Sequence, residues 1–439
     1  MADQPENRED DKDEPNASSQ ESPTKPHSQT KSPSGKKRRR RRSRNERAEV
    51  NSTGGEQKAS AGKNSSQQKK SSRRPVQEGH SILSQEVYGA LDLGTNNCRL
   101  LLAQPTRRGF RVVDAFSRII RLGEGVSRTG RLSDGAMQRT DEALRVCASK
   151  MRRLKVKRAR LVATEACRIA ENGQDFLERI HLGTGLKLEI LSREMEARLA
   201  VSGCASLIDA KTDFVLVFDI GGGSSEIIWL DLNRATDKNK VLRSDRSQIE
   251  NAMLAWTSLP VGVVTLSEKF GGRLITPDVF EAMVAYVMDL VRPFEQKHRI
   301  SERIDGQPMH FLGTSGTVTT LAGVQLGLPR YDRARVDGCW LNVDEARGVT
   351  SSLLAKTFDQ RVQEPCIGAE RADLVMAGCA ILEGLIRLWP CERLRVADRG
   401  LREGILTTLM TEDGVFRSGR RRRRGRSGRR RRSGSNNKD

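Results

Sequence analysis

The feature that most constrains the fold is a motif that occurs twice: an apolar strand ending in Asp, a turn of small residues, and a second apolar strand. The first copy spans residues 87–103, with Asp92 before its turn. The second copy spans residues 217–229, with Asp219 before a triple-glycine turn and Glu226 after it. This repetition predicts two similar α/β halves, each offering one turn to a shared site.

The second turn has no side chains at Gly221, Gly222 and Gly223, and the hydroxyl of Ser224 follows. A bare turn lets backbone N–H groups approach an anion closely, as phosphate binding requires. The flanking acids can hold a divalent cation on the same phosphate. Considered alone, this turn is explained equally well as an ordinary glycine hairpin.

Two other segments repeat this chemistry. The turn of the first copy consists of Gly94, Thr95 and Asn96. His310, which we interpret as structural, precedes a later strand, and that strand leads into a turn that opens a helix. A helix N-terminus is a natural anion site. We therefore expect a third phosphate contact from Gly313, Thr314, Ser315 and Gly316.

Charged residues stand where predicted strands pass into helices. Arg168 follows a strand predicted at 160–164, and Glu196 and Arg198 lie in the first turn of a helix that begins at Ser192. These side chains can face a phosphate ligand. They also have explanations that involve no function: Arg168 can be an ordinary surface arginine, and acidic residues are favoured at the positive N-terminal end of a helix.

Elsewhere the pattern of apolar residues predicts ordinary elements. Apolar residues at helical intervals predict helices over 133–154, capped by Ser133, and over 277–294. The polar stretch 233–248 is predicted to be a loop.

The net charge of +21 belongs mainly to the two ends of the chain. Residues 1–85 carry 19 Lys or Arg against 12 Asp or Glu, and residues 417–439 carry 12 against one. Both segments have too few apolar residues to offset the entropy of ordering, so we predict that they are disordered. Arginine suits phosphate oxygens, so the C-terminal segment is expected to contact polyphosphate or RNA without sequence preference.

The eight scattered cysteines include no Cys-x-x-Cys pair, which favours reduced thiols in a cytoplasmic protein. No apolar run approaches the length of a membrane span, and the N-terminus is polar and acidic. The sequence therefore predicts neither a signal peptide nor a membrane anchor.

Taken in order, the motifs resemble one family. Residues 90–96, 163–168, 192–199, 218–226, 313–317 and 400–404 look like those of the Ppx/GppA family of exopolyphosphatases and guanosine pentaphosphate phosphohydrolases. The resemblance covers about residues 86–410. It implies an α/β fold of two actin-like (ribonuclease H-like, ASKHA) domains, with mixed sheets that flank an interdomain cleft.

The resemblance also implies domain boundaries. A disordered polar and basic tail at 1–85 precedes a first actin-like domain at 86–208, which a return helix at about 398–410 completes. The second actin-like domain occupies 209–397, and a disordered Arg-rich tail occupies 411–439. Since nothing after residue 410 can form the helical C-terminal domains of long members, the chain resembles a short form.

By position, the resemblance assigns roles to single residues. Glu196 matches the carboxylate that activates water, and Arg168 matches an arginine that faces the phosphate. Asp219 and Glu226 match acids assigned to catalysis and magnesium, and Asp92 joins them as a ligand of Mg²⁺ or Mn²⁺. The three small-residue turns would bind phosphate, including Asp92 of the first loop. Two residues depart from the family pattern: Met195 replaces an acid, and Asn97 replaces a serine.

Three functions follow from these motifs. The first is Mg²⁺-assisted release of terminal orthophosphate from inorganic polyphosphate, or alternatively from pppGpp. The second is a kinase or ATPase of the same fold, which the water-activating position of Glu196 disfavours. The third is a polyanion-binding regulatory protein with a weak site, which the basic ends motivate. Analogy with the family favours a homodimer.

Overall fold

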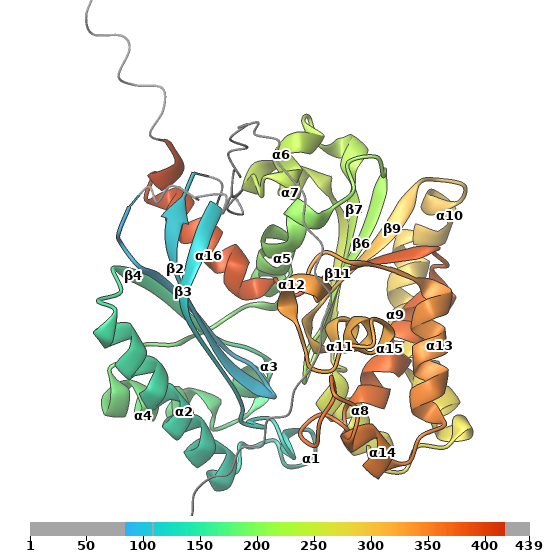
Figure 1. The fold of residues 1–439 in the computed structure, drawn as a ribbon, viewed down its shortest axis with the longest axis horizontal. Coiled ribbons are helices and arrows are strands. Elements are labelled where there is room, and N and C mark those ends of the chain that lie inside the picture. Colours follow the sequence, from blue (N-terminus) through green and yellow to red (C-terminus); the bar gives the residue numbers. More distant parts are fainter. Residues whose placement is uncertain (1–83, 108, 418–439) are drawn as a thin grey trace, which may run out of the picture. The chain divides into compact units, whose positions relative to one another are not determined.

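The computed structural model describes residues 84–107 and 109–417 of the chain. The tail predicted at 1–85 and the Arg-rich segment from residue 418 onward lie almost wholly outside these residues. The described part contains two mixed β-sheets, and helices cover both faces of each sheet (Figure 1).

The first sheet has the strand order β3-β2-β1-β4-β5. Strands β1, β2 and β3 are antiparallel neighbours, whereas β4 runs parallel to β1 and β5 runs parallel to β4. Its strands are β1 (Tyr88–Leu93), β2 (Asn97–Thr106), β3 (Gly109–Ile119), β4 (Arg158–Ala163) and β5 (Glu189–Ile190).

The second sheet has the order β10-β11-β9-β6-β7-β8, which repeats the order of the first sheet and adds β10 at one edge. Strand β6 occupies the position in this sheet that β1 occupies in the first. It pairs antiparallel with β7 and parallel with β9. Its strands are β6 (Phe214–Ile220), β7 (Ser225–Asp231), β8 (Met253–Leu259), β9 (Met309–Thr314), β10 (Trp340–Asn342) and β11 (Arg393–Ala397). The prediction of two similar halves is thus confirmed.

One face of the first sheet packs against helices α2, α3 and α4, and α2 and α4 lie side by side at the lower left of Figure 1. Helix α2 buries one stripe of residues, as its periodicity predicts, and the Ser133 hydroxyl caps it by accepting from the Ala136 N–H at 3.3 Å. The helices of this half are α1 (Val126–Thr129), α2 (Asp134–Arg153), α3 (Glu165–Ile169), α4 (Gly173–Thr184) and α5 (Arg193–Cys204).

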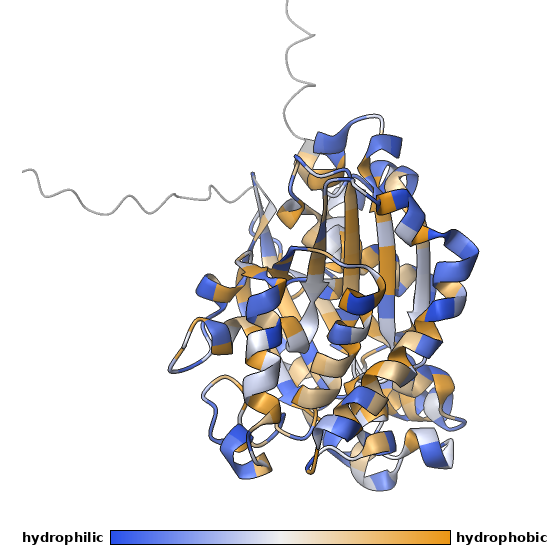
Figure 2. Cartoon of the chain, turned by 90° about the vertical axis from the view of Figure 1, so that its right-hand side faces the viewer, coloured by the Kyte–Doolittle hydropathy of each residue, from blue (hydrophilic) through white to orange (hydrophobic). Residues whose placement is uncertain are grey.

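The largest apolar cluster lies on one face of the second sheet, under helices that include α9 and α15. Figure 2 shows hydrophobic residues concentrated on the strands, with hydrophilic residues on the outer sides of helices and on loops. The helices that follow β7 are α6 (Lys238–Leu242), α7 (Arg246–Ala252), α8 (Val263–Phe270), α9 (Pro277–His298), α10 (Ile300–Ile304), α11 (Ser315–Gln325), α12 (Arg333–Val336), α13 (Val343–Leu354), α14 (Phe358–Val362), α15 (Val375–Leu388) and α16 (Leu401–Glu412).

Helix α16 leaves β11 of the second sheet and packs, beside α5, on the remaining face of the first sheet (Figure 1). Its apolar residues Ile405, Leu406 and Leu409 join a cluster with residues of β1, β2 and β4. The helix continues to Glu412, and a 3₁₀ turn, Val415–Arg417, follows. The folded chain therefore extends a few residues beyond the boundary predicted at residue 411.

Two local predictions are wrong. Residues 233–248 are not a simple loop, because α6 and the start of α7 lie within them, capped by the side chains of Asp237 and Asp245. His310 lies within β9 rather than before it. The side chain of His310 is fully buried and bonds backbone groups of Asp209 and Phe311, as the structural interpretation requires.

Candidate active site

A cavity of about 150 Å³ lies where the ends of β1, β6 and β9 meet the N-termini of α11 and α16. This volume is several times the roughly 10–15 Å³ that one water needs. Most residues predicted to act on phosphate line it: Asp92, Gly94, Thr95, Asn96, Glu196, Asp219, Gly221, Gly222, Gly223, Ser224, Glu226, Thr314, Ser315 and Gly316.

Three predicted residues do not line the cavity. Arg198, which was expected to face the ligand, instead pairs with Glu194 and Glu250. Gly313 lies in β9, where a Cβ would come within 2.6 Å of both Phe218 and Val318, so its lack of a side chain serves packing beneath the site. Arg168 stands behind the cavity wall and contacts the wall residues Glu165 and Glu196.

The triple-glycine turn is pressed against the first turn. A Cβ on Gly222 would lie 3.0 Å from Cβ of Thr95, and a Cβ on Gly223 would lie 2.8 Å from the Thr95 hydroxyl. From the other side, backbone N–H groups of Val263 and Val264 donate to the carbonyls of Gly221 and Gly222 at 3.0 and 2.8 Å. Bare glycines thus let two turns from different sheets meet at the cavity.

The third turn opens α11. Ser315 has φ 76°, a left-handed backbone that residues other than glycine seldom adopt, and Thr314 precedes it as the N-cap. A Cβ on Gly316 would meet nothing within 4 Å. This eleven-residue helix directs the N–H groups of its first turn toward the cavity, and such groups bind anions.

The acids of the cavity are buried and close to one another. Burial is the main cause that raises the pKa of Glu226 to about 7, and the charge of Asp219 is the second. Hydrogen bonds from the hydroxyls of Ser224 at 2.8 Å and Ser258 at 2.9 Å lower this pKa and so oppose the shift. Burial likewise raises the pKa of Asp92 and of Asp219. Such carboxylates gain from any cation that enters the cavity.

The donor set fits a hard divalent cation such as Mg²⁺. Asp92, Asp219 and Glu226 offer carboxylate oxygens, and the buried Asn96 Oδ1 has no hydrogen-bond partner among the described residues. In the same part of the chain, no three His, Cys, Asp or Glu side chains converge as a ready-made metal site. Mg²⁺ suits such a site, because it is usually held by one or two carboxylates together with substrate oxygens and water.

Glu196 is a buried acid in the first turn of α5, which Ser192 caps. Its Oε2 accepts from Nη2 of Arg168 at 2.5 Å. Burial is the main cause that raises the pKa of Glu196 well above its ordinary value, and the charge of Glu226 is the second. The ion pair with Arg168 lowers this pKa but does not cancel the rise. A carboxylate of raised pKa is a stronger proton acceptor once ionised.

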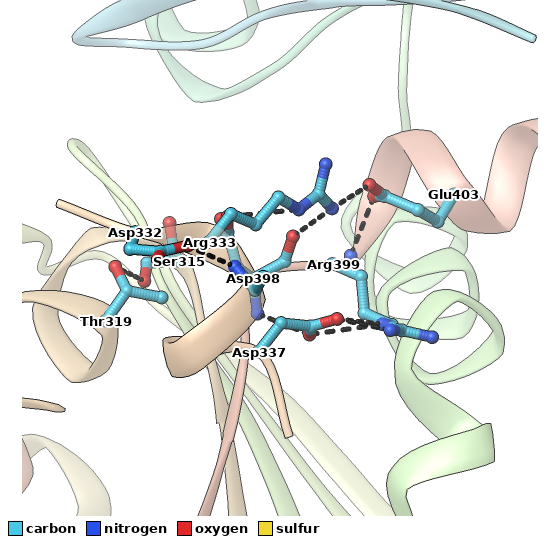
Figure 3. Close-up of polar contacts among 10 residues, drawn as sticks. Ser315, Thr319, Asp332, Arg333, Asp337, Asp398, Arg399 and Glu403 are labelled. Atoms are coloured by element: carbon cyan, nitrogen blue, oxygen red, sulfur yellow. Dashed lines mark hydrogen bonds and ion pairs between the residues drawn. The ribbon is translucent and has the colours of Figure 1, made fainter. Parts of the chain in front are cut away.

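The junction between β11 and α16 forms another wall, which the sequence did not predict as part of the site (Figure 3). Arg333 pairs with Asp398 at 3.2 Å and with Glu403 at 3.0 Å, and Arg399 pairs with Asp337. Glu403 also accepts from the Gly400 N–H at 2.9 Å. These contacts fix the residues that connect the two sheets.

Three further arginines of the cavity wall were missed: Arg99, Arg371 and Arg402. A signal for Arg99 was present, because it pairs in register with Asp92 across the first hairpin, as Glu226 does with Asp219 across the second. The structure also locates the two residues that depart from the family pattern. Asn97 lines the cavity, and Met195 packs partly buried against the apolar cluster beneath α16.

Together, the duplicated sheets, the small-residue turns and the buried acids define an α/β protein of two similar halves with one cavity suited to an anion and a cation. A family model described as the Ppx/GppA phosphatase family matches residues 102–413. The chain belongs to this family.

Relatives and solved structures agree with this assignment. A guanosine-5'-triphosphate,3'-diphosphate pyrophosphatase of Photobacterium profundum is 26% identical over 335 residues, which cover 74% of this chain and 60% of the relative. The chain thus spans about 60% of the length of that relative. The crystal structure of the Aquifex aeolicus Ppx/GppA family member has a TM-score of 0.59 at 26% identity and covers 75% of this chain and 98% of its own.

A crystal structure of an exopolyphosphatase-like protein has a TM-score of 0.62 at 27% identity and covers 74% of this chain and 97% of its own. These structural matches confirm the predicted fold class. Within residues 84–107 and 109–417, no helix has the length and apolar character needed to cross a membrane.

Proposed function

We propose that this protein hydrolyses phosphoanhydride bonds and releases orthophosphate from the end of a phosphate chain. The observation that carries the proposal is one cavity in which three small-residue turns face the buried carboxylate of Glu196. Phosphoryl transfer needs positioning and charge neutralisation more than covalent chemistry. This arrangement of backbone N–H groups, acids and arginines meets that need.

Each group has a role in this proposal. The turns at 94–96, 221–224 and 314–316 bind the oxygens of the terminal phosphoryl group. Glu196 accepts a proton from the attacking water, and Arg168 holds Glu196 in place. Mg²⁺ or Mn²⁺, held by Asp92, Asp219 and Glu226, would neutralise charge on the phosphate oxygens.

Two substrates are supported about equally. The name of the Photobacterium relative supports pppGpp, and the similarity to a solved protein described as exopolyphosphatase-like supports inorganic polyphosphate. Because the same terminal phosphoanhydride is cleaved in both, the residues around the reacting phosphate do not distinguish them.

The deciding experiment is a substrate panel of polyphosphates of several lengths, pppGpp and ATP, each with Mg²⁺ or Mn²⁺. We expect orthophosphate release from polyphosphate or pppGpp, and a loss of about 10²- to 10⁴-fold in kcat for Glu196→Gln. Glu194→Gln is the matched control, because Glu194 is half-exposed on the same helix and pairs with Arg198. No release from any substrate would reject the proposal.

The kinase or ATPase function and the binding function remain distinguishable in the same panel. Consumption of ATP without cleavage of a phosphate chain would favour the former. Binding of polyphosphate that survives in Glu196→Gln, with no hydrolysis by either protein, would favour the latter.

Partners and location remain proposals too. We infer a cytoplasmic protein, since all eight cysteines are free thiols. The Arg-rich segment 418–439 would hold long polyphosphate or RNA through phosphate contacts. Its removal should then raise KM for long polyphosphate and reduce the salt dependence of that KM. The homodimer stays a prediction that light scattering would test.

A further inference from the structure

Glu165 is a buried acid on the cavity wall to which the proposed reaction assigns no role. It is the first residue of α3, separated from β4 by the N-cap residue Thr164, and only 3% of its surface is exposed. Both of its oxygens are engaged by arginines: Oε2 accepts from Nη1 of Arg168, and Oε1 accepts from Nη2 of Arg193 at 2.8 Å.

These residues form an alternating network between two helices. Glu165 and Arg168 are three residues apart on α3, and Arg193 and Glu196 are three residues apart on α5. Glu165 binds both arginines, and Arg168 binds both acids. The outer arginine, Arg193, has 42% of its side chain exposed, whereas the inner three side chains are largely buried.

Arg168 is held from three directions. Its Nε donates to the Leu191 carbonyl at 3.0 Å, its Nη1 donates to Glu165, and its Nη2 donates to Glu196 at 2.5 Å. A planar guanidinium fixed at all three nitrogens cannot turn without breaking a contact.

A second buried acid beside Glu196 adds repulsion to a cavity already rich in carboxylates, so packing alone does not explain it. Glu165 also lies beside the second phosphate turn, because a Cβ added to Gly223 would lie 3.2 Å from its Cγ. The side chain therefore connects the arginine, the proposed base and the phosphate turn.

We propose that Glu165 is a positioning residue, which holds the Arg168 guanidinium against Glu196, the proposed base, while Arg193 holds Glu165 from the outer side. The inference rests on the proposed phosphohydrolase activity for its kinetic effect. The geometric part stands independently, because it concerns the direction of one guanidinium.

The geometric test uses crystal structures of the wild type and of Glu165→Gln. A glutamine of the same shape offers one acceptor where two arginines require two, so we expect the guanidinium of Arg168 to turn and its contact with Glu196 to be lost. A retained contact between Arg168 and Glu196 in the variant would overturn the proposal, whether or not the protein is active.

The kinetic test separates positioning from general damage. For Glu165→Gln we expect kcat to fall by about 10- to 100-fold and KM to change less than about threefold, because misplacing a reacting group acts on the transition state. Glu171→Gln is the matched control, since Glu171 is an exposed acid that pairs with Arg131. Arg193→Lys should keep most of the activity that Arg193→Met loses.

A double-variant cycle completes the test. If Glu165 acts through Arg168, then Glu165→Gln should have less than about a threefold effect in an Arg168→Lys background. Independent, multiplicative losses would overturn the proposal and indicate a structural role. A wild type without phosphatase activity would reject the proposed function, while the crystal structures would still decide the role of Glu165.

Discussion

Replacing Gly223 by Ala tests whether the two phosphate turns really meet. The added Cβ would lie 2.8 Å from the Thr95 hydroxyl and 3.2 Å from Cγ of Glu165, closer than ordinary contacts allow. Overpacking of this kind costs about 1–3 kcal/mol. Since the backbone of Gly223 is not left-handed, Ala also returns about 0.4–1 kcal/mol by restricting the unfolded chain.

The strain can be relieved in two ways, and both are measurable. If the two turns stay in contact, the free energy of unfolding falls by up to about 2.5 kcal/mol. This figure is the upper value for overpacking, about 3 kcal/mol, less the lower value for restricting the unfolded chain, about 0.4 kcal/mol. If the turns separate, a penalty of about 1–3 kcal/mol shifts the ratio of closed to separated forms by roughly 5- to 150-fold. In that case kcat/KM falls by at most the same factor, and by the full factor only when the separated form predominates.

The assay combines thermal unfolding with orthophosphate release. Gly348→Ala is the control, because its Cβ meets nothing and it lies within α13, away from the cavity; we expect it to raise the free energy of unfolding by about 0.4–1 kcal/mol. Thr95→Ala combined with Gly223→Ala should recover part of the lost stability. A Gly223→Ala protein as stable and active as the wild type would refute the contact.

Three further predictions concern other parts of the molecule. Burial lowers the pKa of His310 to about 4, below its unfolded value near 6.5, so its stabilising contribution is present above pH 6.5 and is lost as the pH falls through 4. The loss is roughly 3 kcal/mol, and urea unfolding at several pH values should show a flatter profile for His310→Gln. Glu268 accepts from the Gly125 N–H at 2.8 Å and from the Ser127 hydroxyl at 2.7 Å and so links α8 to the first half, and Glu268→Ala should lower the free energy of unfolding by about 0.2–1 kcal/mol; an unchanged value in urea unfolding would argue against a stabilising contribution from this exposed contact. Mg²⁺ should raise the melting temperature of the wild type more than that of Asp219→Asn, and equal shifts in calorimetry would place the cation elsewhere.

The sequence predicted the parts of the site that local patterns encode. The Asp, small-residue turn and second strand are contiguous, so the hairpins with Asp92 and Asp219 could be recognised directly. Hairpin register then places Glu226 opposite Asp219, and the same reasoning would have placed Arg99 opposite Asp92. The roles given to these residues stay predictions until variants are assayed.

Contacts between distant segments could not be predicted in this way. Glu165 meets Arg193 across 28 residues, and only the packing of α3 beside α5 brings them together. The short helices α6 and α7 have good caps, but they are too short for periodicity to reveal. Their burial of Val241 and Ile249 against the second sheet supplies the stability that their lengths do not.

The packing of the C-terminal helix α16 on the first sheet has a consequence for folding during synthesis. One face of the first sheet is covered by Leu401, Ile405, Leu406, Leu409 and Met410, although its strands lie within residues 88–190. At about 5–20 residues per second, a ribosome needs roughly 10–40 s to make the intervening 200 or so residues. During that interval the nascent sheet exposes apolar strands, so we expect it to bind chaperones until the final helix emerges.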